Sequence, residues 1–218
     1  MKTPDWIFRS LPFLFPKKKK ETKVELERFI QERWKVVTKR LRVEGVSEPR
    51  LKFWLPGSRP FYRNGAVYLS YSIILKSTEN QITTLDHEIT HHIQHSRNSH
   101  IRMTYSVEFL SFFYWCLTGK LRFGLANRSF QEGFATYVAY LTSGKLPKKV
   151  ENGKTIVQNG KRLKMLFKDA GALPYVLGGL AYAAIAETKP EDEVLQLGLS
   201  ANVRGWVLSA EAALSKLP

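Results

Sequence analysis

The residues with the clearest chemical potential are clustered near the middle of the chain. All five histidines lie between positions 87 and 100. The first two, His87 and His91, are the first and last residues of the segment His-Glu-Ile-Thr-His. On a helix, residues four apart are separated by one turn and about 40°, so both imidazoles can point at one metal ion. Glu88 projects about 100° from His87, within reach of a metal-bound water. The alternative is a polar helix face whose histidines are solvated or hydrogen-bonded.

A third metal ligand is expected from another element of the fold. The single cysteine, Cys116, excludes an intramolecular disulfide and a cysteine-based zinc cluster. His95 is available, but it lies one turn farther along the same predicted helix. Glu132, in the segment Glu-Gly-Phe-Ala at 132–135 of a later predicted helix, is the better candidate. Its alternative role is a helix capping box with Ser129.

Together these two motifs resemble those of the gluzincin clan of zinc peptidases, and the second is similar to the Glu-Gly-Phe-Ala block of neutral-zinc aminopeptidases. The resemblance implies that His87, His91 and Glu132 bind Zn²⁺ and that Glu88 is the general base. It also implies a tyrosine that assists the developing oxyanion. Tyr175, in the segment Tyr-Val-Leu-Gly, is similar to that tyrosine, with leucine where the family has lysine. The alternative for Tyr175 is a core tyrosine on a buried helix.

The chain departs from the aminopeptidases in two respects. Glu132 follows His91 by 41 positions (132 − 91), a much longer spacing than theirs, and the Gly-x-Met-Glu-Asn segment that binds a substrate amino terminus is absent. Trimming of amino termini is therefore not implied. The chain is more similar to the small minigluzincins and peptidase-MA-like proteins, over roughly residues 60 to 187.

The elements that must position these residues are mainly helical. Apolar residues recurring at three and four predict an amphipathic helix over 21–43, and β-branched and aromatic residues predict strands at 51–55 and 66–74, joined by a loop or hairpin. A helix capped at Ser77 or Thr78 should carry the histidines to about residue 95. Further helices are predicted at 103–117, 129–142, 169–187 and 203–216. The fold class is α+β: a mostly helical zincin-like domain with a small sheet preceding the active-site helix.

The positive charge is concentrated in two segments. The 218 residues include 34 Lys and Arg against 19 Asp and Glu, a net charge of +15, and residues 1–50 and 145–168 together contribute +14. We therefore expect a basic N-terminal extension with an amphipathic helix at 1–50 and a zincin-like metallopeptidase domain at 51–218. Apolar residues from Trp6 to Phe15 beside the lysines at 17–20 favour an anionic membrane surface as a partner over nucleic acid. The alternative is an ordinary solvated surface.

No targeting segment is expected, because the apolar N-terminal stretch precedes its lysines instead of following them. The longest uncharged window, 170–186, has 17 residues, fewer than the roughly 20 of a spanning helix, and is predicted to be a buried helix. The predicted location is cytoplasmic, with membrane association through the N-terminal extension.

The predicted function is zinc-dependent peptide-bond hydrolysis on a peptide or protein substrate. Strand 66–70 is expected at a sheet edge, where an extended substrate adds as a further strand, which favours an endopeptidase. One alternative is a basic membrane- or nucleic-acid-binding protein with a structural or regulatory metal site. Another is a regulatory gluzincin-like protein that cleaves one specific repressor.

Overall fold

The structure is a computed structural model that describes residues 16–54, 61–63, 65–70, 73, 78–98, 114–115, 117–118, 120–144, 173–200 and 202–215. These ranges contain six helices with defined bounds and one three-stranded sheet, an α+β arrangement as predicted. The chain forms two compact units, Met1–His92 and Ile93–Pro218. The predicted boundary between an N-terminal extension at 1–50 and a metallopeptidase domain at 51–218 stays a prediction.

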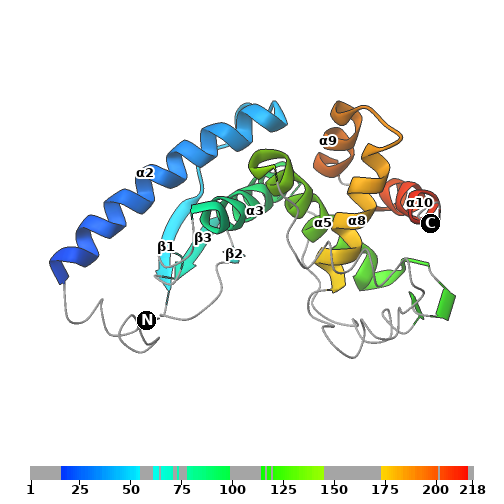
Figure 1. The fold of residues 1–218 in the computed structure, drawn as a ribbon, viewed down its shortest axis with the longest axis horizontal. Helices are drawn as coiled ribbons and strands as arrows, with labels where there is room; N and C mark the ends of the chain where they lie inside the picture. The colour runs from blue at the N-terminus through cyan, green and yellow to red at the C-terminus, as the bar shows by residue number, and fades with distance from the viewer. Residues whose placement is uncertain are drawn as a thin grey trace. The chain divides into compact units, whose positions relative to one another are not determined.

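The N-terminal unit begins with the long helix α2, Pro16–Leu41, close to the predicted amphipathic helix (Figure 1). Its buried residues recur at three and four along the chain: Leu26, Ile30, Trp34, Val37 and Leu41. Charged residues such as Arg28 and Lys35 are exposed between them. The periodicity therefore predicted correctly which side of this helix packs.

The sheet comprises β1, Arg50–Trp54, β2, Phe61–Arg63, and β3, Ala66–Ser70, in the order β1-β3-β2. β3 pairs in parallel with β1 and antiparallel with β2. The prediction that strand 66–70 is an edge strand is wrong, because β3 is the central strand. The hairpin partner of β3 is β2, a strand that was not predicted, and not the strand predicted at 51–55. Gly65, between β2 and β3, has φ +73°, as such a tight turn requires.

The helix that carries the histidines is α3, Thr78–Arg97. One side of it forms a stripe of fully buried apolar side chains: Leu85, Ile89 and Ile93. The predicted helix is thus confirmed, two residues longer at its C-terminal end.

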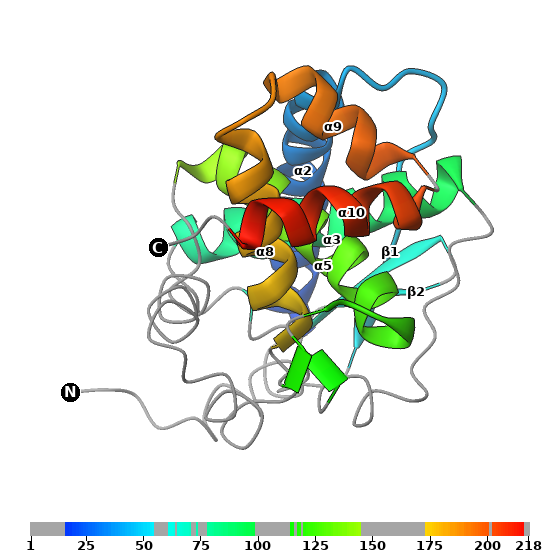
Figure 2. The same cartoon turned by 90° about the vertical axis from the view of Figure 1, so that its right-hand side faces the viewer.

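The C-terminal unit is helical, with α5 at Phe123–Ser143, α8 at Leu173–Ala186, α9 at Glu191–Leu199 and α10 at Val203–Leu214. The helix α9 was not predicted. α5 and α8 share the most extensive packing of this unit, and Figure 2 shows α10 lying across α8. Their shared core is a group of stacked and tilted aromatic rings: Phe130, Phe134, Tyr137, Tyr182 and Trp206.

Several sequence-based predictions fall outside the described residues. These are the apolar segment before residue 16, most of the helix predicted at 103–117 with Cys116, and most of the basic segment at 145–168. Among the helices that the described ranges contain, none has the length and apolar character needed to cross a bilayer. The uncharged window at 170–186 yields the 14-residue α8, whose side chains are mostly buried.

Candidate metal site

The two histidines of the 87–91 motif project from the side of α3 opposite its apolar stripe. At 100° per residue, Leu85, Ile89 and Ile93 centre on Ile89, and the midpoint between His87 and His91 lies about 180° from it. Because burial of the stripe fixes the rotation of the helix, both imidazoles are directed to the opposite side.

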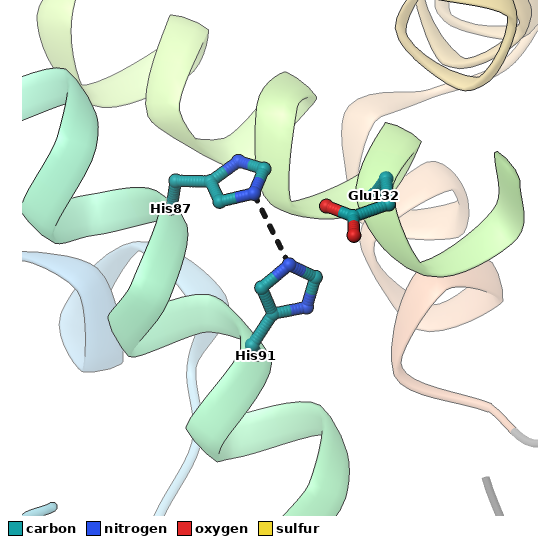
Figure 3. A group of neighbouring side chains, drawn as sticks. All are labelled: His87, His91 and Glu132. Carbon is teal, nitrogen blue, oxygen red and sulfur yellow. Dashed lines mark hydrogen bonds between the residues drawn. The ribbon is translucent and has the colours of Figure 1, made fainter. Parts of the chain in front are cut away.

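The two imidazoles of the motif contact each other through their Nε2 nitrogens. The Nε2 atoms of His87 and His91 are 3.1 Å apart, with the ring planes at 88° (Figure 3). A contact of this length requires one nitrogen to donate and the other to accept. His91 is 5% exposed and His87 is half-buried. The pair is therefore mostly shielded from water, which argues against a solvated face, whereas the hydrogen bond between the two rings agrees with the hydrogen-bonded form of the alternative.

Glu132 of α5 lies next to this pair. The ligand atoms offered by His87, His91 and Glu132 all lie within 4.8 Å of one another, and Figure 3 shows the carboxylate beside the two rings. Glu132 is 4% exposed. The structure thus brings together the three residues that the sequence selected as ligands, although their binding of a metal stays a prediction.

The donor set and its dimensions fit zinc. Two imidazole nitrogens and one carboxylate oxygen form a common three-ligand zinc set, with bonds of about 2.0 to 2.2 Å. Ligand atoms on such a tetrahedron are about 3.4 Å apart. The 3.1 Å histidine contact is close to this value, whereas the 4.8 Å limit exceeds it by about 1.4 Å, a difference that a carboxylate can make up by rotating its side chain.

A half-buried arginine accompanies the carboxylate. Arg128, one turn before Glu132 on α5, places its Nε 3.9 Å from Oε1, and the two side chains are 20% and 5% exposed. This distance is too long for a hydrogen bond but makes an ion pair. The guanidinium therefore offsets part of the cost of burying the Glu132 charge.

A close helix crossing fixes the backbone beside Glu132. A Cβ on Gly133 would lie 2.3 Å from the carbonyl carbon of Gly178 on α8, and a Cβ on Gly178 would lie 2.0 Å from the Ser129 oxygen. Both positions therefore require glycine. This explains why a glycine follows the predicted ligand in the motif: Gly133, next to Glu132, is the residue at which α8 contacts α5.

The capping-box alternative for Glu132 is excluded by the bounds of α5. The helix begins at Phe123 after Arg122, so Ser129 is a buried interior residue, two turns from the helix start. The helix predicted to begin at Ser129 in fact begins six residues earlier. Glu132 therefore projects from the middle of α5 and caps no helix end.

The two predicted catalytic residues lie on the elements expected for them. Glu88 is on α3 and 8% exposed. Tyr175 is half-buried in the first turn of α8, three residues before Gly178. The roles of Glu88 as general base and of Tyr175 at the oxyanion stay predictions.

Two residues of α3, neither identified from the sequence, anchor this helix to other parts of the N-terminal unit. Asp86, directly before His87, is fully buried and forms a two-point ion pair with Arg33 of α2. His92, directly after His91, contacts the Ser47 carbonyl through Nε2 at 2.8 Å. The only signal in the sequence was a charged residue and a histidine beside the motif, and neither identified its partner.

No protein-family model, no curated protein and no solved structure matches this chain. What the chain does must therefore be argued from its own residues.

Proposed function

We propose that this chain is a zinc-dependent peptidase of the gluzincin type with a zincin-like fold. The observation that carries the proposal is the proximity of His87, His91 and Glu132, whose ligand atoms lie within 4.8 Å of one another. Two imidazoles from consecutive helical turns and one carboxylate from a second helix form the ligand set of many catalytic zinc sites, which keep a fourth position open. Zinc in such a site acts as a Lewis acid and lowers the pKa of a coordinated water to about 7.

The residues of the chain itself then have separate tasks. His87, His91 and Glu132 hold the metal, and Glu88 accepts the proton of the attacking water and gives it to the leaving amine nitrogen. Tyr175 donates a hydrogen bond to the oxygen of the substrate carbonyl as negative charge develops on it. Glu88 is only 8% exposed, so bulk water is largely kept away from this carboxylate.

A direct test uses the zinc-loaded full chain, a mixed peptide library and mass spectrometry of the products. We expect new amino and carboxyl termini inside the peptides, and their loss in Glu88→Gln with zinc content unchanged. Glu79→Gln is the matched control, because Glu79 is an exposed glutamate in the first turn of the same helix. Undiminished cleavage by Glu88→Gln would remove Glu88 from the mechanism.

The same experiment separates the alternative functions. Stoichiometric zinc with no cleavage of any peptide would favour a basic binding protein with a structural or regulatory metal site. Cleavage of one protein only, with the library intact, would favour the regulatory peptidase.

A separate experiment tests the membrane partner proposed for the N-terminal segment. Binding of the chain to anionic vesicles, lost on removal of residues 1–20, would support that partner.

A further inference from the structure

Arg33 of α2 and Asp86 of α3 form a two-point ion pair within the N-terminal unit. The Nε and Nη2 atoms of Arg33 donate to the two oxygens of Asp86 at 2.9 Å and 2.6 Å. The side chains are 13% and 0% exposed. A two-point, charge-assisted contact of this kind fixes orientation as well as distance.

A second contact holds α3 one and a half turns later. The Nε2 of His92 donates a hydrogen bond to the Ser47 carbonyl oxygen at 2.8 Å. The imidazole also packs against the rings of Trp34 and Tyr62, at centroid distances of 5.7 Å and 5.5 Å. His92 is 4% exposed, so this contact too is shielded from water.

These anchors are immediate neighbours of the metal-binding histidines. Asp86 precedes His87 and His92 follows His91, so each anchor lies 100° around the helix from its histidine, on the outer side of the pair. The midpoint of the two anchors is then opposite the midpoint of the two imidazoles. A rotation of α3 about its axis would break the anchors and turn both imidazoles by the same angle.

Packing of α3 against α2 does not by itself require a charged pair at this position. Replacing a buried ion pair with apolar side chains of similar volume is often neutral or stabilising, so stability alone does not call for charges here. Apolar contacts from Leu85 and Ile89 tolerate a small rotation, whereas the paired bonds to Asp86 do not.

We propose that Arg33 is a positioning residue of the metal site, which acts through Asp86 to set the direction in which His87 and His91 point. The inference rests on the proposed function in assigning a metal to these histidines. It gives α2 a role beyond a basic extension, because one of its buried residues determines the geometry of the site.

The test measures zinc affinity by competition with a chromophoric chelator, and the visible absorption of the Co²⁺-substituted full chain. Arg33→Met should raise the zinc dissociation constant about tenfold, at the low end for residues that support metal ligands indirectly, and change the Co²⁺ bands. Val37→Ala is the control, since Val37 is fully buried on the same helix and its truncation destabilises the packing of α2 while both side chains of the ion pair are kept. At matched thermal stability, Val37→Ala should keep wild-type affinity and Co²⁺ bands.

Two further variants keep the test decisive if Arg33→Met does not fold. Arg33→Lys retains the charge but not the two-point geometry, and Asp86→Asn retains one acceptor oxygen, so both should weaken zinc binding less than Arg33→Met. Wild-type affinity and Co²⁺ spectra in all folded Arg33 and Asp86 variants would overturn the inference while leaving the proposed function intact. Failure of the wild-type chain to bind zinc or Co²⁺ would overturn both.

Discussion

Replacing Gly133 with alanine should disrupt the metal site through the helix that crosses behind it. The added Cβ would lie 2.3 Å from the carbonyl carbon and 2.4 Å from the Cα of Gly178. Carbon atoms in contact are normally about 3.5 Å apart or more, so α5 and α8 must separate by roughly 1.2 Å near this point. Both obstacles are backbone atoms, which cannot move aside as a side chain can.

Two opposing effects set the size of the change. Alanine is favoured over glycine within a helix by about 1 kcal/mol, which would stabilise Gly133→Ala if there were space. Overpacking of a closely packed core costs about 1 to 3 kcal/mol. The contact is far below van der Waals distance and against backbone, so we expect the upper part of that range to prevail, with a net loss of about 1 to 2 kcal/mol.

Gly133→Ala should weaken metal binding as well as stability. Glu132 is the adjacent residue, and a shift of its backbone by about 1 Å is large compared with the roughly 0.2 Å within which metal–ligand distances are held. We therefore expect the zinc dissociation constant to rise at least tenfold, measured by chelator competition, alongside urea unfolding. Gly178→Ala should reproduce both losses from the other helix, because its Cβ would lie 2.0 Å from the Ser129 oxygen.

The control for this prediction is Gly144→Ala at the C-terminal cap of the same helix. Gly144 has φ +74° and nothing within 4 Å of an added Cβ, so alanine there strains the backbone without moving α5. It should lower stability by about 1 kcal/mol and leave zinc affinity unchanged. Wild-type stability and zinc affinity in Gly133→Ala would refute the link between the helix crossing and the position of Glu132.

Two other substitutions test charges and polar groups inside the C-terminal unit. Arg128→Gln should tighten zinc binding several-fold in calorimetric titration, because the guanidinium 3.9 Å from the Glu132 carboxylate repels a dication; weaker binding would instead assign Arg128 to holding the carboxylate in place. Tyr182→Phe should stabilise the chain by about 1 kcal/mol in urea unfolding, because the buried Tyr182 hydroxyl has no hydrogen-bond partner within the described residues. Burial also raises the pKa of Tyr182 well above its usual value near 10, so the folded state keeps this proton to higher pH. The stabilisation from that proton is complete below pH 10 and is lost as the pH rises through the folded pKa, so wild type should lose more stability than Tyr182→Phe in this alkaline range, and an equal loss would count against the burial of this hydroxyl.

Local patterns in the sequence were sufficient to predict most helices and the candidate ligands. The spacing of apolar residues in 21–43 and of the histidines in 87–91 is set within a few turns of one helix, so each could be seen without knowing the fold. The start of α5 was misplaced because Arg122 provides no side-chain cap, whereas Ser129 with Glu132 has the spacing of a capping box. The capping-box spacing at Ser129 is real, but α5 begins at Phe123, six residues before it.

The features that could not be predicted depend on residues far apart in the chain. Parallel pairing of β1 with β3 places β3 in the centre of the sheet, and no local signal distinguishes a central from an edge strand in five residues. The Arg33–Asp86 pair joins residues 53 positions apart. The helix α9 did have local signals, with Pro190 followed by an acidic first turn, but it is only nine residues long.

The most direct measurement of the central claim is the zinc content of the full chain and two neighbouring variants, determined by elemental analysis after dialysis against buffered zinc. The wild-type chain should hold one zinc per chain, and Glu132→Ala should lose it. Gln131→Ala is the matched control, a buried neighbour on the same helix whose side chain bonds to Asn127, and it should retain the metal. No zinc in the wild-type chain, or one full equivalent in Glu132→Ala, would contradict a site built from His87, His91 and Glu132.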